Sequence, residues 1–145
     1  MAVAVDRAYE TRPSWLHPLH AVLLAGTLPL FLGALLSDIA YSASYEIQWN
    51  NFASWLIAGG LVFGAIALLW AVVDLFRDAR GGRGSLSYVL LLLATWILGF
   101  VNALVHAKDA WASMPNGLVL SVVVLALACG ATWAGFSMSR AAGAR

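Results

Sequence analysis

Three polar residues near the end of an apolar segment are the first candidates for chemistry in this chain. Asn102, His106 and Asp109 are spaced i, i+4 and i+7, so they share one face of a helix that runs that far. An imidazole can titrate near neutrality, and a carboxylate can orient one of its ring nitrogens. The spacing therefore predicts a site, centred on His106, that exchanges a proton or a hydrogen bond with a ligand.

Other polar residues are expected at the same end of the molecule, because they end or begin neighbouring apolar segments. Together they would form a polar cup with an apolar floor. The alternative is that Asn102 and His106 only join the third segment to its neighbours, while the charged residues face water. A metal could be bound in the cup by His106, Asp38 and Asp109, but their spacing matches no recognised metal-binding motif. The residues predicted to form the cup are His106, Asn102, Asp109, Asp38, Gln48, Asn51 and Trp111.

A second candidate site lies at the start of the first apolar segment, where His17 and His20 are one helical turn apart and Pro18 fits a first turn. Either both histidines are interfacial residues that start the helix, or one of them ligates a haem or contacts a quinone. A haem b shared by His20 and His106 is disfavoured, because parallel first and third spans place them about 25–30 Å apart. Pairing of either histidine with a methionine, or of two His106 residues across a dimer axis, stays open.

The elements that must position these residues are membrane spans. The chain has 145 residues, of which 62% are hydrophobic and 10% are charged, far from the composition of soluble domains. Four uncharged runs cover residues 21–36, 52–73, 86–105 and 117–138. We predict an all-α bundle of four transmembrane helices. Residues 1–15 would form an N-terminal tail, 16–139 a single four-span domain and 140–145 a C-terminal tail.

The basic residues indicate the orientation of these spans. All arginines lie on one side of the predicted bundle, and Lys108 alone lies on the other. By the positive-inside rule, both termini are cytoplasmic and the His106 cup faces outwards. In a bacterial cell this places the protein in the inner membrane, with the cup on the periplasmic side. The charge bias is therefore a topology signal, and no nucleic-acid partner is expected.

Small residues at four-residue intervals are expected to form packing surfaces. Gly60 and Gly64 lie in the second segment, and Ala126, Gly130 and Ala134 lie in the fourth. Such stripes let helix backbones approach closely, within one bundle or between copies in a homo-oligomer. The lone cysteine of the fourth segment, at position 129, is expected to be a small packing residue.

Two stretches resemble the DUF2231 family of small bacterial membrane proteins. They are LHPLHAVLLAGTLPLFLGALLSDIAY and NALVHAKDAW with the following MPNGLVLS, and the resemblance extends from about Leu16 to beyond Ser121. It implies a four-helix inner-membrane protein. Through relatives joined to Rieske-type or cytochrome modules, it also implies an association with membrane redox chemistry. The family is one of unknown function, so the resemblance assigns no catalytic residue.

The expected function is that of a redox-associated accessory or electron-transfer subunit. In this role the His106 site contacts a quinone or a haem, and the protein works in the lipid bilayer beside a membrane or periplasmic redox partner. The first alternative is a purely structural or assembly protein. The second, with less support, is a passive pathway for a proton or small solute. The sequence shows no nucleophile elbow, no phosphate-binding glycine loop and no CxxC pair, so no independent catalytic activity is expected.

Overall fold

The computed structural model describes residues 17–77, 83–108 and 110–143. In these ranges the chain forms five α-helices and no strand. Four of the helices are long and apolar enough to cross a membrane, and the fourth in order is a single turn. The predicted all-α bundle with four spans is thus confirmed. The helices are α1 (Pro18–Ser44), α2 (Ile47–Arg77), α3 (Arg83–His106), α4 (Ala110–Ser113) and α5 (Asn116–Gly143).

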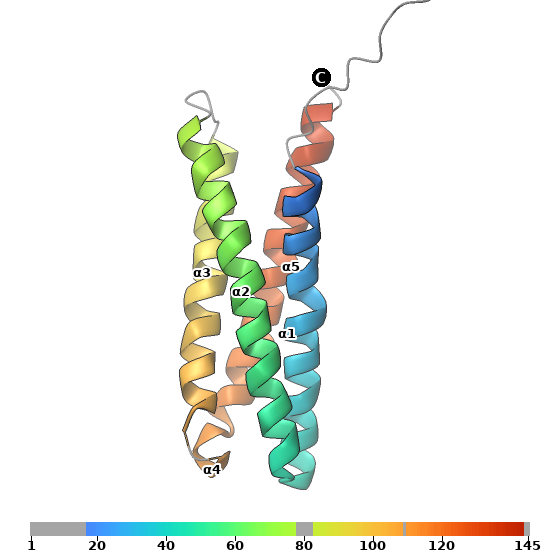
Figure 1. Ribbon diagram of the computed structural model, residues 1–145, viewed down its shortest axis with the longest axis vertical. Coiled ribbons are helices and arrows are strands. Elements are labelled where there is room, and N and C mark those ends of the chain that lie inside the picture. The colour runs from blue at the N-terminus through green and yellow to red at the C-terminus, as the bar shows by residue number, and fades with distance from the viewer. Residues whose placement is uncertain (1–16, 78–82, 109, 144–145) are drawn as a thin grey trace, which may run out of the picture.

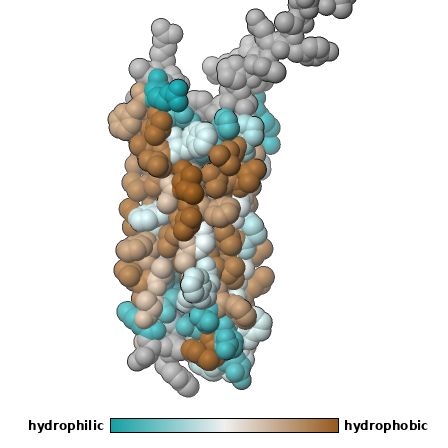
Figure 2. All heavy atoms as spheres, in the orientation of Figure 1, coloured by the Kyte–Doolittle hydropathy of each residue, from teal (hydrophilic) through white to brown (hydrophobic). Residues whose placement is uncertain are grey.

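The four long helices form an up-and-down bundle in which α1 and α3 are diagonal (Figure 1). Each of these two helices packs against both α2 and α5. Because α1 and α3 run in the same direction, their first residues share one end of the bundle, here called the His20 end. Their last residues share the opposite end with α4, here called the His106 end. Figure 2 shows an apolar middle between two more polar ends, as a membrane protein requires.

Local interactions explain why α1 begins before and ends after its uncharged run. His17 is the N-cap and its Nδ1 accepts a hydrogen bond from the Leu19 amide at 3.2 Å, while Pro18 occupies the first turn. At the other end, serine hydroxyls donate to helix carbonyls one turn back, as in Ser44 to Ala40 at 2.7 Å. The helix stops at Tyr45, whose left-handed φ of 55° turns the chain towards α2.

Glycines allow the helices to approach one another. A Cβ atom on Gly60 would lie 2.6 Å from the Phe31 ring, so this position of α2 must be glycine for α1 to pack against it. The packing role predicted for Gly60 is therefore found within the bundle. Cys129 differs from expectation because it is exposed on the outer face of α5. Nearly every position of this segment is apolar, so its sequence does not separate the lipid-facing side from the core.

Candidate functional site

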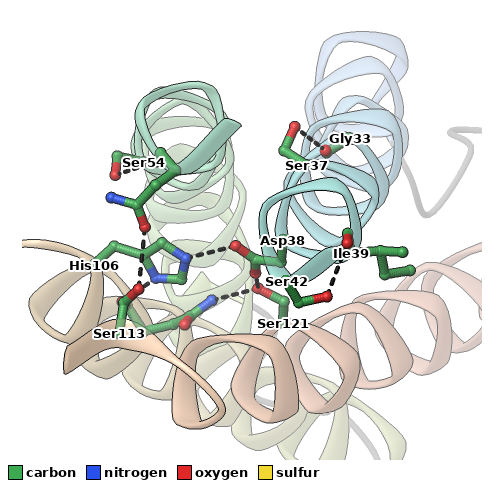
Figure 3. Close-up of polar contacts among 11 residues, drawn as sticks. Gly33, Ser37, Asp38, Ile39, Ser42, Ser54, His106, Ser113 and Ser121 are labelled. Carbon is green, nitrogen blue, oxygen red and sulfur yellow. Dashed lines mark hydrogen bonds and ion pairs between the residues drawn. The ribbon is translucent and has the colours of Figure 1, made fainter. Parts of the chain in front are cut away.

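A histidine and an aspartate meet inside the His106 end of the bundle. His106 Nε2 lies 2.8 Å from Asp38 Oδ1, and neither side chain is exposed. Asp38 is on α1 and His106 is the last residue of α3, so this contact joins the two diagonal helices (Figure 3). Asp38 lies within the last two turns of α1, so it is at the same level of the bundle as the end of α3, and its side chain is buried.

The other atoms of the pair are also bonded, and together they form a closed ring of hydrogen bonds. Ser121 Oγ of α5 donates to Asp38 Oδ2 at 2.5 Å, and Asn102 Nδ2 donates to Ser121 Oγ at 2.9 Å. The ring closes where His106 Nδ1 meets the main-chain carbonyl of Asn102 at 2.9 Å. The interhelical hydrogen bond predicted for Asn102 is therefore made, with α5 as the partner helix.

The bonding pattern fixes how many protons the pair holds. The Asn102 carbonyl can only accept, so His106 Nδ1 carries a proton. One further proton must then lie between His106 Nε2 and Asp38 Oδ1, either on the ring or on the carboxylate. Both arrangements have zero net charge, which limits the cost of burying the pair. The pair thus holds two protons in a site closed to solvent, one on His106 Nδ1 and one shared between His106 Nε2 and Asp38 Oδ1.

A second buried hydrogen bond at the same end involves the two remaining helices. Ser113 of α4 donates its hydroxyl to Asn50 Oδ1 of α2 at 3.2 Å, and both residues are buried. Gly117 at the start of α5 makes room for the imidazole, because a Cβ atom there would lie 2.8 Å from His106 Cε1. All five helices therefore contribute a buried polar residue at this end. We call Asp38, Asn50, Asn102, His106, Ser113 and Ser121 the His106 network.

Only part of the predicted cup is assembled. The structure brings Asp38, Asn102 and His106 together, whereas Gln48 and Asn51 are exposed on α2 and lie outside the network. They do not reach the pair because adjacent positions on a helix point in different directions, and it is Asn50 that is buried.

The last two members of the predicted cup follow the end of α3. The helix stops at His106, so the face predicted to reach Asp109 does not continue that far, and Asp109 itself lies outside the described residues. Trp111 belongs to the separate helix α4. The extension of the cup along one continuous helix face is therefore wrong, because the chain turns at residues 107–108.

The serines of the network are absent from the sequence-based prediction. Ser113 and Ser121 are small, common residues of membrane segments and carry no distinctive pattern. One available signal is the spacing of Gly117 and Ser121, which are four residues apart and therefore share a face of α5. A glycine beside a polar residue on one face indicates where a bulky polar side chain from another helix can enter.

The second candidate site separates into two unlike residues. His17 is exposed and caps α1, with its ring 5.0 Å from that of Trp70. His20 is buried, and its Nε2 lies 2.8 Å from the Tyr88 hydroxyl of α3. Within the described part of the chain, His20 Nδ1 has no hydrogen-bond partner.

The distance between His20 and His106 excludes a haem iron bound by both residues. His20 and Asp38 are separated by 18 residues of one helix, about 27 Å, so His20 and His106 lie at opposite ends. One iron cannot bind both. Across residues 17–77, 83–108 and 110–143, no group of three or more His, Cys, Asp or Glu side chains is arranged to hold a metal ion.

Comparison with known proteins gives one finding. The family model described as "Predicted membrane protein (DUF2231)" matches residues 16–145, a range that contains the whole His106 network and the His20–Tyr88 pair. No curated protein and no solved structure matches the chain.

Proposed function

Because the chain belongs to the DUF2231 family of predicted membrane proteins, we propose its function from the His106 network. The protein is a non-catalytic accessory or assembly protein, a four-span scaffold whose helices are locked together at one end. The arginines favour an orientation in the bacterial inner membrane with both termini in the cytoplasm and the network near the periplasmic face.

The observation that supports this role is that every polar side-chain atom of the His106–Asp38 pair is hydrogen-bonded within the protein. Both ring nitrogens of His106 and both carboxylate oxygens of Asp38 have protein partners. Neither ring nitrogen of His106 is free to bind a haem iron or another ligand unless one of these bonds breaks, and both oxygens of Asp38 already accept a bond within the protein. Ionisable residues in a membrane span are costly, and here each bond connects two elements or closes the ring. The arrangement favours a structural role over haem ligation. We call this role the lock: the His106–Asp38 pair holds the helices together at one end.

A second candidate role is contact with a quinone as a redox-associated accessory subunit. One observation favours it: Asn102 Oδ1 is buried and has no partner within the described residues. A quinol hydroxyl could donate to this oxygen without disturbing the His106–Asp38 bond. A passive proton or solute pathway has less support, because Phe31, Val124 and Ala128 form a buried apolar cluster between the two ends.

The two roles are separated by comparing wild-type protein with His106→Ala and Asn102→Ala. Thermal unfolding of the detergent-purified full chain and its quinone and haem content are measured together. The lock predicts that His106→Ala unfolds at least 5 °C lower and that no variant changes the bound quinone. The control is His17→Asn, which removes an exposed imidazole but keeps a side-chain acceptor at the N-cap of α1.

The opposite pattern would favour the second role. In that case the wild-type protein carries quinone, Asn102→Ala removes it, and His106→Ala unfolds within about 1 °C of wild type. An absorption spectrum with haem bands that His106→Ala abolishes would contradict the proposed lock outright.

A further inference from the structure

A groove runs along the outer face of α5 towards the His20 end. It has a volume of about 260 Å³. The walls are mostly apolar or aromatic, and the only cationic side chain among them is Arg140, near the C-terminal end of α5. This α5 groove is lined by Leu28 of α1 and by Cys129, Thr132, Trp133, Phe136 and Arg140 of α5.

The length of the groove matches one leaflet of a bilayer. Cys129 and Arg140 are eleven residues apart on one helix, a rise of about 16 Å. Half of a hydrocarbon core of ~30 Å is about 15 Å. An acyl chain that begins at the polar boundary beside Arg140 would therefore reach the middle of the membrane at Cys129.

The arginine is folded back along the groove. Its guanidinium carbon lies 5.8 Å from the centre of the Trp133 ring, and Trp133 precedes it by seven residues. The charge is thus held over an indole on the membrane side of its own backbone position, whereas a snorkelling arginine would extend beyond the helix end. In the part of the chain that the structure describes, Arg140 has no ion pair with a carboxylate.

A cation at the edge of the hydrocarbon requires an anionic partner, and the surroundings define which kind. Guanidinium groups bind phosphate through two parallel hydrogen bonds, and basic sites beside membrane helices bind anionic lipid head groups. The apolar groove continues directly from this charge towards the membrane centre. We propose that the α5 groove binds one anionic phospholipid, with its phosphate at Arg140 and an acyl chain along Phe136 and Cys129.

The test uses the full chain in phosphatidylcholine vesicles that contain a small fraction of brominated lipid, which quenches nearby tryptophans. Brominated phosphatidylglycerol is compared with brominated phosphatidylcholine at equal mole fraction, and Trp133→Phe identifies the share of the signal that comes from the groove. We expect phosphatidylglycerol to be preferred at Trp133 by about fivefold, the size typical of one basic residue at an anionic surface.

Two arginine variants make the result specific. Arg140→Gln should abolish the preference, whereas Arg77→Gln should leave it intact, because Arg77 is an exposed arginine at the same end but on α2. Circular dichroism establishes that both variants are folded. Equal quenching by the two lipids would overturn the proposal, as would an equal loss in both variants. Protection of Trp133 from both lipids, together with a dimer on cross-linking, would assign the groove to a second copy of the chain instead.

Discussion

The two ends of the bundle use the same geometry with different chemistry. At each end a histidine joins the diagonal helices α1 and α3, through His20 and Tyr88 at one end and Asp38 and His106 at the other. Within each helix the two polar positions are 18 residues apart, which is five complete helical turns. Both positions therefore point into the bundle, and they lie about 27 Å apart, close to the thickness of the hydrocarbon core.

The difference between the ends lies in how completely each pair is bonded. The His106 end contains a carboxyl group, and the Ser121 hydroxyl and the Asn102 main-chain carbonyl bond the remaining polar atoms of the pair. The Asn102 side chain in turn donates to Ser121. At the His20 end imidazole meets a phenol, a pair that can stay neutral, and His20 Nδ1 has no partner among the described residues. A buried carboxyl group needs a hydrogen-bond partner for each of its oxygens, because an unpaired buried charge is very costly. In a pair of neutral groups, one atom without a partner costs less.

The largest expected effect comes from breaking the pair formed by Asp38 and His106. Asp38→Leu or His106→Phe alone should destabilise the protein by about 3 kcal/mol, because each leaves a buried partner unpaired. Replacing both should recover at least half of that loss, since an apolar pair of similar size needs no compensation. Equilibrium unfolding in mixed micelles containing SDS measures all three variants. Additive losses in the double variant would contradict the account of this end as a coupled pair.

The next effect comes from the glycine that admits the imidazole. Gly117→Ala should cost about 1–2 kcal/mol, because the new methyl group would lie 2.8 Å from His106 Cε1 and the ring is held from both nitrogens. Gly64→Ala is the matched control, since its nearest side-chain contact would be an ordinary 3.7 Å to Trp96. The control should be neutral or slightly stabilising in the same unfolding assay, and equal losses at both positions would point to a general intolerance of alanine.

The sequence predicts the spans and the end at which each polar residue lies better than it predicts which polar residues bond to one another. Four uncharged runs suffice to predict four spans, because a bilayer requires long apolar helices. The runs also place His106 and Asp38 at one end, because their order along the chain fixes the direction of each span. The bonding partners are less predictable. Asn50 and Asn51 are adjacent and identical in type, and only the rotation of α2 buries one and exposes the other.

These two asparagines provide a smaller, internally matched test. Asn50→Ala removes the acceptor of the Ser113 hydroxyl and should cost about 1 kcal/mol, within the range measured for hydrogen bonds between membrane helices. Asn51→Ala changes the same side chain one position later, where it is exposed, and should change the unfolding free energy by less than about 0.5 kcal/mol. A larger loss at Asn51 than at Asn50 would mean that the outer surface of α2 carries a contact of its own.

The smallest expected effect is at the opposite end. A double-mutant cycle of His20→Ala and Tyr88→Phe isolates the bond between the imidazole and the phenol, and its coupling energy should be about 0.6 kcal/mol, the average for such bonds in membranes. The same cycle with Asp38 and His106 should give a coupling several times larger, because both side chains are wholly buried and either one alone would be left as an unpaired polar or charged group inside the bundle. Equal coupling at the two ends would contradict a stronger link between α1 and α3 at the His106 end. It would then be the 18-residue spacing, common to α1 and α3, that explains how the diagonal helices are joined.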